Sequence, residues 1–403
     1  MKEWKTYKLG DLINIQSGGT PNKAISAYWG GGIPWISAKT MYVDFITDSD
    51  LHITEEGLKN GSKLAPIGSI LLLTRGSGLF NRIPVCLVKE PVAYNQDIKC
   101  ITVKDGSITS NAFMFFWLYS QKELLSGILE TTGIGAGKID TCRLLDINVL
   151  LPDIETQSKF IQFCSSILEK IEVNKQINDN LEQQAQALYK SWFVDFEPFK
   201  DGEFIESELG QIPEGWQCIP FSMFVSESKA KTGKIGIKEY SVTNNGIFPR
   251  DAKYNKSLSQ SSTKNKLILY GDLVFGMSRD ILNWGVMQEE QGGVSSAYTV
   301  YNINSGIVNS TYLELFIKSR IHLFSDLIRP AAREGQGIDK SVLQTKVLLC
   351  PPQEVLDTFW PLYNSVTNQI QRTTTEINFL GDVRDTLLPK LMSGELKINE
   401  IDC

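Results

Sequence analysis

Short loops rich in glycine, hydroxyl, amide and basic side chains are the parts of this 403-residue chain that could do chemistry. Glycine lets backbone N–H groups come close to a phosphate, while Arg, Lys, Asn and Gln can hydrogen-bond to base edges in a DNA groove. A single loop of this kind is usually just exposed to solvent. Nucleic-acid binding is indicated because such loops recur at several places along the chain. The loops are Ser17–Pro21, Trp35–Lys39, Thr74–Gly78, Tyr94–Asp97, Lys229–Lys234, Arg250–Lys253, Met277–Asp280 and Ser295–Tyr298.

The known enzyme motifs that we searched for are not found in the sequence. Residues 132–140 resemble a phosphate-binding GxxxxGK[ST] loop, but that motif needs Gly and Ser or Thr where this chain has Thr132 and Ile139. The Asn-Pro-Pro-Tyr and Asp-Pro-Pro-Tyr motifs of amino-methyltransferases, GxSxG and HExxH are all missing. His52 and His322 are isolated among apolar neighbours, and the seven cysteines form no CxxC pair. We therefore expect no catalytic residue, no metal site and no cofactor.

The net charge of −6 is distributed unevenly along the chain. Residues 1–150 carry a net charge of +1 and residues 217–350 carry +5, whereas residues 151–216 carry −8 and residues 351–403 carry −4. The acidity is therefore confined to two segments, and the neutral-to-basic blocks remain able to bind phosphate.

Neither end of the chain and no internal segment predicts a membrane protein. No apolar stretch follows the charges of the N-terminus, as a signal peptide would require. The longest apolar run, Ala112–Tyr119, is far shorter than the ~18 residues of a membrane span. We expect a cytoplasmic protein.

The chain repeats itself. The segment 137–152 is similar to the segment 335–351, and Ile139 and Pro152 align with Ile338 and Pro351 at an offset of 199. Upstream, Lys63 aligns with Lys266 at an offset of 203. Such a constant relation over many residues predicts two copies of one plan, each about 200 residues long.

Each copy begins with a mixed region. The runs 69–73, 84–88, 267–275 and 297–303 have the composition of strands and alternate with Gly, Asn and Asp turns. The apolar segments Phe113–Tyr119 and Tyr312–Ile317 each predict a short helix. The fold class is therefore α+β, with two α/β domains in an internal pseudo-twofold repeat.

Each copy ends in a long helix. The first begins after Pro152, with Asp153 as its N-cap, and runs to about Trp192. Apolar residues three or four positions apart form a coiled-coil stripe that is interrupted by Asn174 and Thr373. Either each helix packs on its own domain or the two helices pack on each other, and two equivalent stripes favour the second arrangement. The stripe residues are Phe160, Ile167, Leu181, Leu188, Phe359, Val366, Leu380 and Leu387.

The chain resembles, over essentially its whole length, the specificity subunit of type I restriction–modification systems. The region that joins the two copies carries the most specific part of this resemblance. The matching segments are Ser17–Pro21, Tyr28–Ile36, Leu73–Gly76, Tyr189–Phe199, Gly210–Trp216, Val242–Gly246 and Tyr270–Val274.

The resemblance implies two target-recognition domains separated by two long antiparallel helices. Residues 1–152 would form the first recognition domain, 153–200 the first spacer helix, 201–215 a linker, 216–351 the second recognition domain, and 352–403 the second spacer helix with a tail. Helices of about 40 residues would be about 60 Å long, enough to hold two readers of double-stranded DNA at half-sites about 34 Å apart.

The same resemblance implies the partners and the role. Each recognition domain would read one half of a bipartite, gapped site, and the helices would dock two copies of a DNA adenine methyltransferase subunit, with a restriction and translocase subunit joining. Because the two recognition domains differ greatly in sequence, we expect an asymmetric target. The chain would itself be a non-catalytic subunit.

The expected DNA-binding residues follow the matching motifs. In the first domain, the DNA backbone would be bound by Gly18, Gly19, Thr20 and Lys39, and bases or adjacent phosphates by Arg75, Asn95 and Gln96. In the second domain the candidates are Lys231, Lys234, Arg250, Arg279 and Ser296. Lys138 and Gln336, which lie before the two long helices, are further phosphate candidates.

Two other functions stay open on the sequence alone. A coiled-coil adaptor that only bridges proteins would explain the helices but leave the repeated loops without a purpose, and it would show no salt-dependent DNA affinity. A self-sufficient DNA methyltransferase or nuclease would bind its cofactor as an isolated chain, which the missing motifs argue against.

Overall fold

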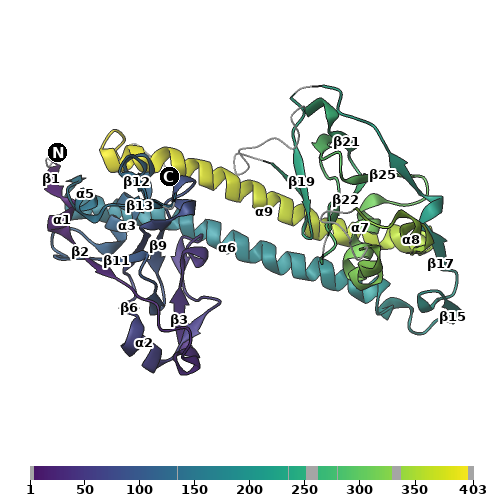
Figure 1. The fold of residues 1–403 in the computed structure, drawn as a ribbon, viewed down its shortest axis with the longest axis horizontal. Coiled ribbons are helices and arrows are strands. Elements are labelled where there is room, and N and C mark those ends of the chain that lie inside the picture. Colours follow the sequence, from purple (N-terminus) through teal and green to yellow (C-terminus); the bar gives the residue numbers. More distant parts are fainter. Residues whose placement is uncertain are drawn as a thin grey trace. The chain divides into compact units, whose positions relative to one another are not determined.

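A computed structural model of the chain describes residues 4–133, 135–234, 236–250, 262–278, 280–328 and 337–397. The chain divides into two compact units, which we call unit 1 (Met1–Asn178 with Gln371–Cys403) and unit 2 (Asp179–Ile370). Each unit combines β-sheets, short helices and a part of both long helices (Figure 1). The predicted mixture of helix and sheet is confirmed, whereas the finer boundaries at residues 152, 200, 215 and 351 stay a prediction.

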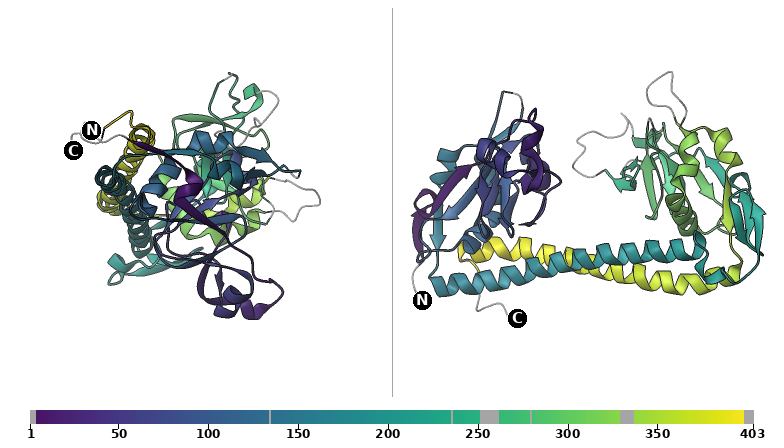
Figure 2. Two further views of the ribbon diagram at one scale, coloured as in Figure 1. Left: turned by 90° about the vertical axis from the view of Figure 1, so that its left-hand side faces the viewer. Right: turned by 90° about the horizontal axis from the view of Figure 1, so that it is seen from below.

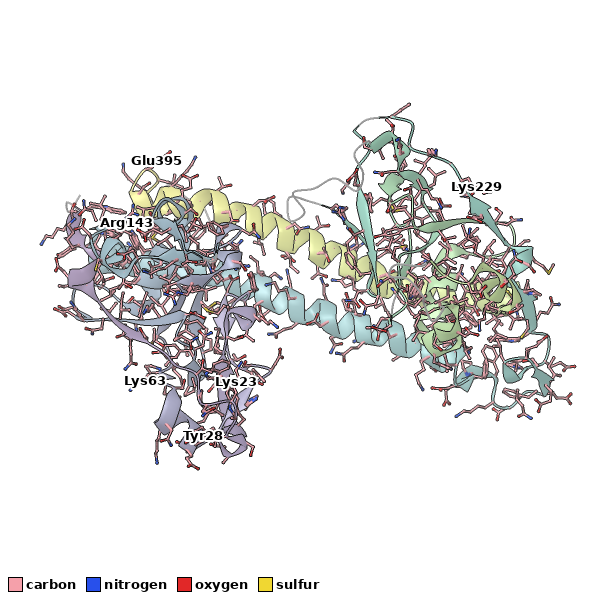
Figure 3. All side chains as sticks on the ribbon, in the orientation of Figure 1. Lys23, Tyr28, Lys63, Arg143, Lys229 and Glu395 are labelled. Carbon is pink, nitrogen blue, oxygen red and sulfur yellow. The ribbon has the colours of Figure 1, made fainter. Side chains whose placement is uncertain are left out.

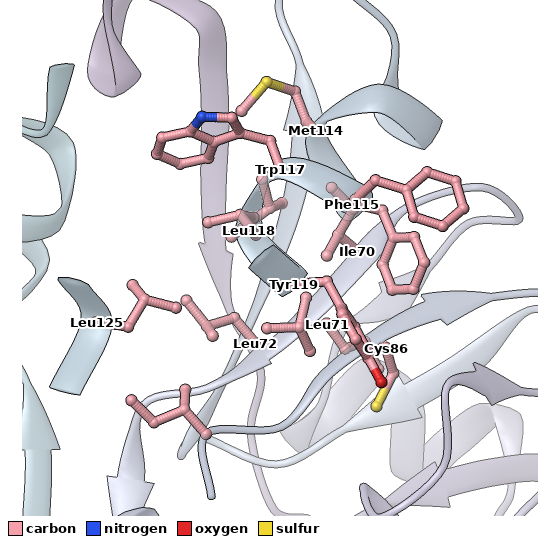
Figure 4. Packing of buried hydrophobic residues seen from close by; sticks show 14 of the residues in the cluster. Ile70, Leu71, Leu72, Cys86, Met114, Phe115, Trp117, Leu118, Tyr119 and Leu125 are labelled. Carbon is pink, nitrogen blue, oxygen red and sulfur yellow. The ribbon is translucent and has the colours of Figure 1, made fainter. Parts of the chain in front are cut away.

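The central sheet of unit 1 is packed against one apolar helix. Its strand order is β2 (Ile13–Ser17), β11 (Ile98–Val103), β7 (Ile70–Leu73), β9 (Val85–Val88) and β4 (Phe45–Ile46). The helix α3 (Asn111–Ser120) buries every side chain from Phe113 to Tyr119. Figure 4 shows several of these side chains together with those of Ile70–Leu72 of β7. The predicted strands at 69–73 and 84–88 and the helix at 113–119 are confirmed.

A second sheet of unit 1 brings loop ends together. Its order is β5 (His52–Ile53), β3 (Trp29–Ile36), β10 (Val92–Tyr94) and β6 (Leu64–Ala65). Strands β3 and β10 are parallel, with Ile36 beside Tyr94. The segments that follow these two strands therefore start at the same edge of the sheet. The other elements of unit 1 are β1 (Lys5–Lys8), α1 (Leu9–Leu12), η1 (Ser26–Tyr28), η2 (Ala38–Thr40), α2 (Glu55–Gly61), β8 (Arg75–Gly76), η3 (Ser77–Phe80), α4 (Lys122–Gly127), β12 (Leu129–Thr131), β13 (Gly137–Ile139), α5 (Thr141–Leu145) and β14 (Asn148–Leu151).

Unit 2 repeats the plan of unit 1. Its sheet has the order β18 (Val225–Ser228), β25 (Thr299–Ile303), β22 (Leu273–Phe275) and β23 (Trp284–Val286), which corresponds to β2-β11-β7-β9. The register also agrees, because Ile70 pairs with Ile101 in unit 1 and Leu273 pairs with Tyr301 in unit 2. The predicted duplication and the predicted helix at 312–317, now α7 (Ser310–Ser319), are confirmed.

The remaining elements of unit 2 include a hairpin that the sequence did not predict. Segment 201–215, expected as a linker, contains the paired strands β15 (Phe204–Ser207) and β16 (Gly210–Pro213). Gly210 permits the turn because its φ is +90°. The other elements are η4 (Glu197–Phe199), β17 (Gln217–Pro220), η5 (Phe221–Met223), β19 (Tyr240–Thr243), β20 (Gly246–Pro249), η6 (Ser262–Lys264), β21 (Lys266–Leu269), β24 (Gln291–Val294), η7 (Ile321–Leu327), α8 (Lys340–Thr345) and β26 (Val347–Cys350).

The two long helices are α6 (Ile154–Phe193) and α9 (Gln353–Ser393). Asp153 caps α6 as predicted, because its Oδ1 accepts hydrogen bonds from the backbone N–H groups of Glu155 and Thr156 at 3.1 and 3.3 Å. Within each unit the two helices run side by side (Figure 2). Along the part of the chain that the structure describes, no helix is long and apolar enough to cross a membrane.

The apolar stripe of the helices packs on the α/β parts as well as on the other helix. Phe160 is buried against Trp4 and Phe113, with ring centroids 6.2 and 6.4 Å away. Phe359 is buried against Phe193 of α6, 4.7 Å away, in the core of unit 2. Both packing modes considered from the sequence therefore contribute. Of the other stripe residues, Ile167 is buried, and the half-buried ones are Leu181, Leu188, Val366, Leu380 and Leu387.

In unit 1 the two helices meet at polar side chains. Asn174 is buried and its Nδ2 donates to Glu376 Oε2 at 2.9 Å, while Asn178 Nδ2 donates to Thr374 Oγ1 at 3.0 Å. Lys170 pairs with Glu376 at 3.5 Å. The predicted interruption of the stripe at Asn174 and Thr373 is present, since Thr373 is also buried. Such contacts fix the register of antiparallel helices at a cost in stability.

We expect Asn174→Leu to raise the free energy of unfolding by about 1 kcal/mol, because the buried Oδ1 of Asn174 accepts no hydrogen bond from a described residue. Glu376 would keep Lys170 as its partner. Urea unfolding of the variant and of the parent protein measures the change. A decrease of 1 kcal/mol or more would show that the Asn174–Glu376 bond contributes more than the unpaired oxygen costs.

Candidate nucleic-acid interface

Three of the candidate loops of unit 1 are anchored on the end of β10. The backbone N–H of Gly19 donates to Tyr94 O at 2.9 Å, and Ser62 Oγ donates to the same oxygen at 3.0 Å. The N–H of Asn95 donates to Ile36 O at 3.0 Å. The segments 17–20, 37–39 and 95–97 are therefore held together at one edge of the molecule's first unit, as a shared binding surface requires.

Gly18 and Gly19 are needed for this close approach of backbones. A Cβ on Gly18 would lie 2.1 Å from Tyr94 O and 2.5 Å from Asn95 O. A Cβ on Gly19 would lie 2.3 Å from Gly61 O. The structure thus gives both glycines a packing reason, and the backbone of segment 17–20 is rigidly placed.

We expect Gly18→Ala to lower the free energy of unfolding of unit 1 by about 1–3 kcal/mol, because backbone atoms cannot move away from the new methyl group without strain. Gly32→Ala is the matched control, since no atom lies within 4 Å of a Cβ at that position. Thermal unfolding of the two variants checks the difference. Equal transition temperatures would contradict the packing argument.

The polar side chains on this edge are joined in pairs. Thr20 Oγ1 donates to Gln96 Oε1 at 2.6 Å, and Lys99 Nζ donates to Ser17 Oγ at 2.5 Å. Gln96 is exposed, whereas Asn95 is buried and its Oδ1 accepts from the N–H of Asp97 at 3.0 Å. Asn95 therefore shapes the turn, and Gln96 is the amide that this turn presents to solvent.

Cations without carboxylate partners gather at the same edge. Arg75 on β8 is paired in register with Lys138 on β13, and Arg75 is exposed. Arg75, Lys138 and the exposed Lys39 form no ion pair with any residue that the structure describes. Burial and, after it, the charge of Arg75 lower the pKa of Lys99, while the carboxylate of Asp97 opposes this shift. Arg75 therefore lies close enough to Lys99 for their charges to interact.

Elsewhere in unit 1, several basic side chains are paired with carboxylates. Carboxylates bind Lys8 at 2.8 Å, Arg82 at 3.6 Å and Lys122 at 3.3 Å. Two further exposed lysines, Lys23 and Lys63, lie toward the end of unit 1 that carries α2 (Figure 3). Unit 1 thus also carries cations without a printed ion pair outside this edge, and the candidate edge is distinguished by the loops that converge on it.

In unit 2 the corresponding loops also converge. Lys231 forms an isolated bridge with Lys266, and the N–H of Thr232 donates to Asn265 O at 3.0 Å. Lys266 Nζ donates to Tyr298 O at 2.6 Å, which places segment 295–298 nearby. Lys231, Lys234 and Ser296 are all exposed. Arg250 is half-buried and its Nη1 donates to Ser241 Oγ at 3.0 Å.

Two predicted site residues of this unit, Arg279 and Gln336, lie outside the described residues. Glu227, on the other hand, is surrounded by lysines that the sequence did not single out. Lys340 Nζ pairs with Glu227 Oε1 at 2.5 Å. This hydrogen bond, followed by the charges of Lys340 and Lys266, keeps the pKa of Glu227 below its usual value. Lys229, on the same unit (Figure 3), adds to this positive charge.

Comparison with known proteins identifies several related chains. Residues 1–183 match the family described as type I restriction modification DNA specificity domain. The type I restriction enzyme MjaIX specificity subunit of Methanocaldococcus jannaschii is 28% identical over 421 residues, which covers 99% of this chain and 95% of that protein. The HindI specificity subunit of Haemophilus influenzae is 38% identical over 210 residues, covering 50% of this chain and 43% of that protein.

Along its whole length the chain is similar to a specificity subunit of a type I restriction enzyme, and residues 1–183 match the DNA specificity domain of that family. Its fold is that of the S subunit from M. genitalium, with a TM-score of 0.53, 12% identity and 96% of both chains covered. These relatives are named as specificity subunits of type I restriction enzymes.

Three of the cysteines are held as neutral thiols by burial. Burial raises the pKa of Cys86 and of Cys164 to about 12 and that of Cys350 to about 11. Thiols with such pKa values are protonated at neutral pH and are poor nucleophiles. Among the described residues, no group of three His, Cys, Asp or Glu side chains is arranged to hold a metal ion.

The two long helices carry exposed apolar side chains outside the buried stripe. Phe379 of α9 is 64% exposed, and Val173 and Ile177 of α6 are 49% and 38% exposed. All three belong to unit 1, and in unit 2 Leu362 is 48% exposed. Val173 and Ile177 are one turn apart on the same face of α6, whereas a single exposed apolar side chain such as Leu362 is ordinary on a protein surface.

Proposed function

We propose that the chain is a specificity subunit and that each of its units reads one half of a bipartite, gapped DNA site. The observation that carries the proposal is that several loops and cations without an ion pair converge on one edge of unit 1. In unit 2 the corresponding loops converge in the same way and carry lysines. The two surfaces have the same scaffold but different side chains. Different side chains bind different base sequences, so the proposed target is asymmetric.

The proposed roles follow the geometry of the side chains. In unit 1, Gly18, Gly19, Thr20, Lys39 and Lys138 would contact or position the DNA backbone, while Arg75 and Gln96 would reach the bases. Asn95 would act through the turn that presents Gln96. In unit 2 the proposed contacts are Lys231, Lys234, Arg250, Arg279, Ser296 and Gln336.

We further propose that the helices dock two copies of the DNA adenine methyltransferase subunit, and that a restriction and translocase subunit joins this complex. Stripe residues such as Phe160 and Phe359 are buried in their own units and cannot contact a partner directly. The exposed side chains of Val173, Ile177, Phe379 and Leu362 are better placed for that contact. The buried stripe would support docking by keeping the helices straight and in register.

The proposal is tested by variants confined to one unit. In a complex with the modification subunit, Arg75→Ala in unit 1 should alter recognition in one half of the methylated motif, and Lys231→Ala with Lys234→Ala in unit 2 should alter only the other half. The motif is obtained by mapping N6-methyladenine in a host that lacks adenine methylation. Variants of both units that change the same half would contradict the assignment of one half-site to each unit.

The main alternative is an adaptor that bridges proteins without contacting DNA. It would give a stable complex whose methylation pattern is independent of every residue on the two loop surfaces. The unpaired cations Lys39, Arg75 and Lys138 would then have no function, and their removal would leave the salt dependence of DNA binding unchanged.

A further inference from the structure

The hydrogen bond between Thr20 and Gln96 has the amide oxygen of Gln96 toward Thr20 and leaves the amide nitrogen without a described partner. Thr20 Oγ1 donates to Gln96 Oε1 at 2.6 Å, so the amide oxygen is directed toward Thr20. No described residue accepts a hydrogen bond from Gln96 Nε2, and the side chain is exposed. Gln96 therefore presents a donor group, two N–H bonds on Nε2, to whatever binds this surface.

Both partners of this bond stand on rigid backbone. Segment 17–20 is held by the Gly19 N–H to Tyr94 O bond and by Trp35 Nε1, which donates to Gly19 O at 3.0 Å. The turn after Asn95 is closed by the bond from the N–H of Asp97 to Asn95 Oδ1. Both the N–H and the hydroxyl of Thr74 donate to Asp97 O, at 2.8 and 3.0 Å. The Nε2 group of Gln96 is therefore held in one position as a hydrogen-bond donor.

We infer that Gln96 is a specificity-determining residue that donates to a base, and that Thr20 is its positioning residue. The inference rests on the proposed function. In the major groove guanine, adenine and thymine each present an acceptor atom, whereas cytosine presents the N4 amino group, which is a donor. The half-site read by unit 1 therefore excludes cytosine at the base that Gln96 contacts.

Gln96→Glu converts the donor into an acceptor of nearly the same shape, and it is the sharpest test. The variant, the parent chain and the control Asn14→Asp are each co-expressed with the modification subunit, and N6-methyladenine is mapped. Asn14 is an exposed amide on β2 of the same unit, so its replacement makes the same change of charge without touching the Thr20–Gln96 pair. Folding is checked by the thermal unfolding of each variant.

For Gln96→Glu we expect a shift of at least tenfold toward cytosine at one base of one half-site, because a carboxylate accepts from the N4 amino group of cytosine. The other half-site and the gap should stay unchanged. Thr20→Val, which keeps the shape but removes the hydroxyl, should weaken discrimination at that same base without a new preference. The complex that contains the Asn14→Asp variant should methylate the same motif as the complex with the parent chain.

Two results would overturn the inference while leaving the proposed function intact. One is an unchanged motif in Gln96→Glu with methylation lowered evenly at all sites, which would make Gln96 a phosphate contact. The other is a loss of discrimination in Thr20→Val at a different base from the one altered in Gln96→Glu. If Gln96→Glu fails to fold, Gln96→Leu replaces it, and an unrelaxed motif in that variant also overturns the inference. If the proposed function were wrong, the methylated motif would be the same for every variant of the chain and also when the chain is omitted. This result differs from both of the results above.

Discussion

Replacing Lys39, Arg75 and Lys138 together by alanine is expected to weaken DNA binding of the complex by roughly a hundredfold. Each lost contact of a cation with the DNA costs at least about 1 kcal/mol, so three cost about 3 kcal/mol. The slope of log affinity against log salt concentration should fall by about 1.8, at about 0.9 for each of the two phosphate contacts proposed for Lys39 and Lys138. The three side chains form no ion pair with a described residue, so their removal leaves no buried charge behind.

Fluorescence anisotropy over a series of salt concentrations measures both quantities. The matched control replaces Lys5, Lys89 and Lys104, which lie away from the loop edge in β1 and directly after β9 and β11 of the same unit, form no ion pair with a described residue and remove the same charge. The control should retain most of the affinity and nearly the parental slope. Equal losses in the two triple variants would mean that unit 1 attracts DNA by its overall charge and has no defined surface.

Phe359→Ala is expected to cost about 3–5 kcal/mol of unfolding free energy in unit 2, whereas Phe379→Ala on the same helix should cost almost none. The ring of Phe359 is fully buried and lies 4.7 Å from Phe193, 5.7 Å from Trp192 and 5.5 Å from Tyr363. Its removal leaves a cavity among aromatic rings. Phe379 is 64% exposed, so the folded protein loses little packing with it.

The affinity for the modification subunit should depend more on Phe379 than on Phe359. Phe379→Ala is expected to weaken binding of the modification subunit about tenfold or more, because buried aromatic residues dominate interface energies. Urea unfolding and co-purification with the modification subunit distinguish the two effects. A Phe379→Ala protein that is stable and binds normally would remove this side chain from the docking face.

Local patterns in the sequence were sufficient for the main architecture. The offset between the copies, the cap at Asp153 and the long apolar stripe correspond to observed elements, because capping and periodicity act over a few residues. Contacts between residues far apart in the sequence were harder to predict. Lys99 joins the site only because β11 pairs with β2 and sets Lys99 opposite Ser17. No local pattern reports such a pairing.

The aromatic end of α6 illustrates the same limit. Residues 201–215 were expected to be a linker, and the sequence did not predict the hairpin that they contain. It also did not predict that Phe196 and Phe199 pack on Trp216 at 5.4 and 5.2 Å. Likewise, the sequence treated Asn95 and Gln96 as equivalent amides, but the turn buries the first and exposes the second.

The most direct test of the central claim is a methylation map made with and without this chain. The chain is co-expressed with its modification subunit in a host that lacks adenine methylation, and N6-methyladenine is located across the genome. We predict an asymmetric motif in two parts with a fixed gap, which disappears when the chain is omitted. Methylation that persists without the chain, or a single uninterrupted palindrome, would contradict the assignment of one half-site to each unit.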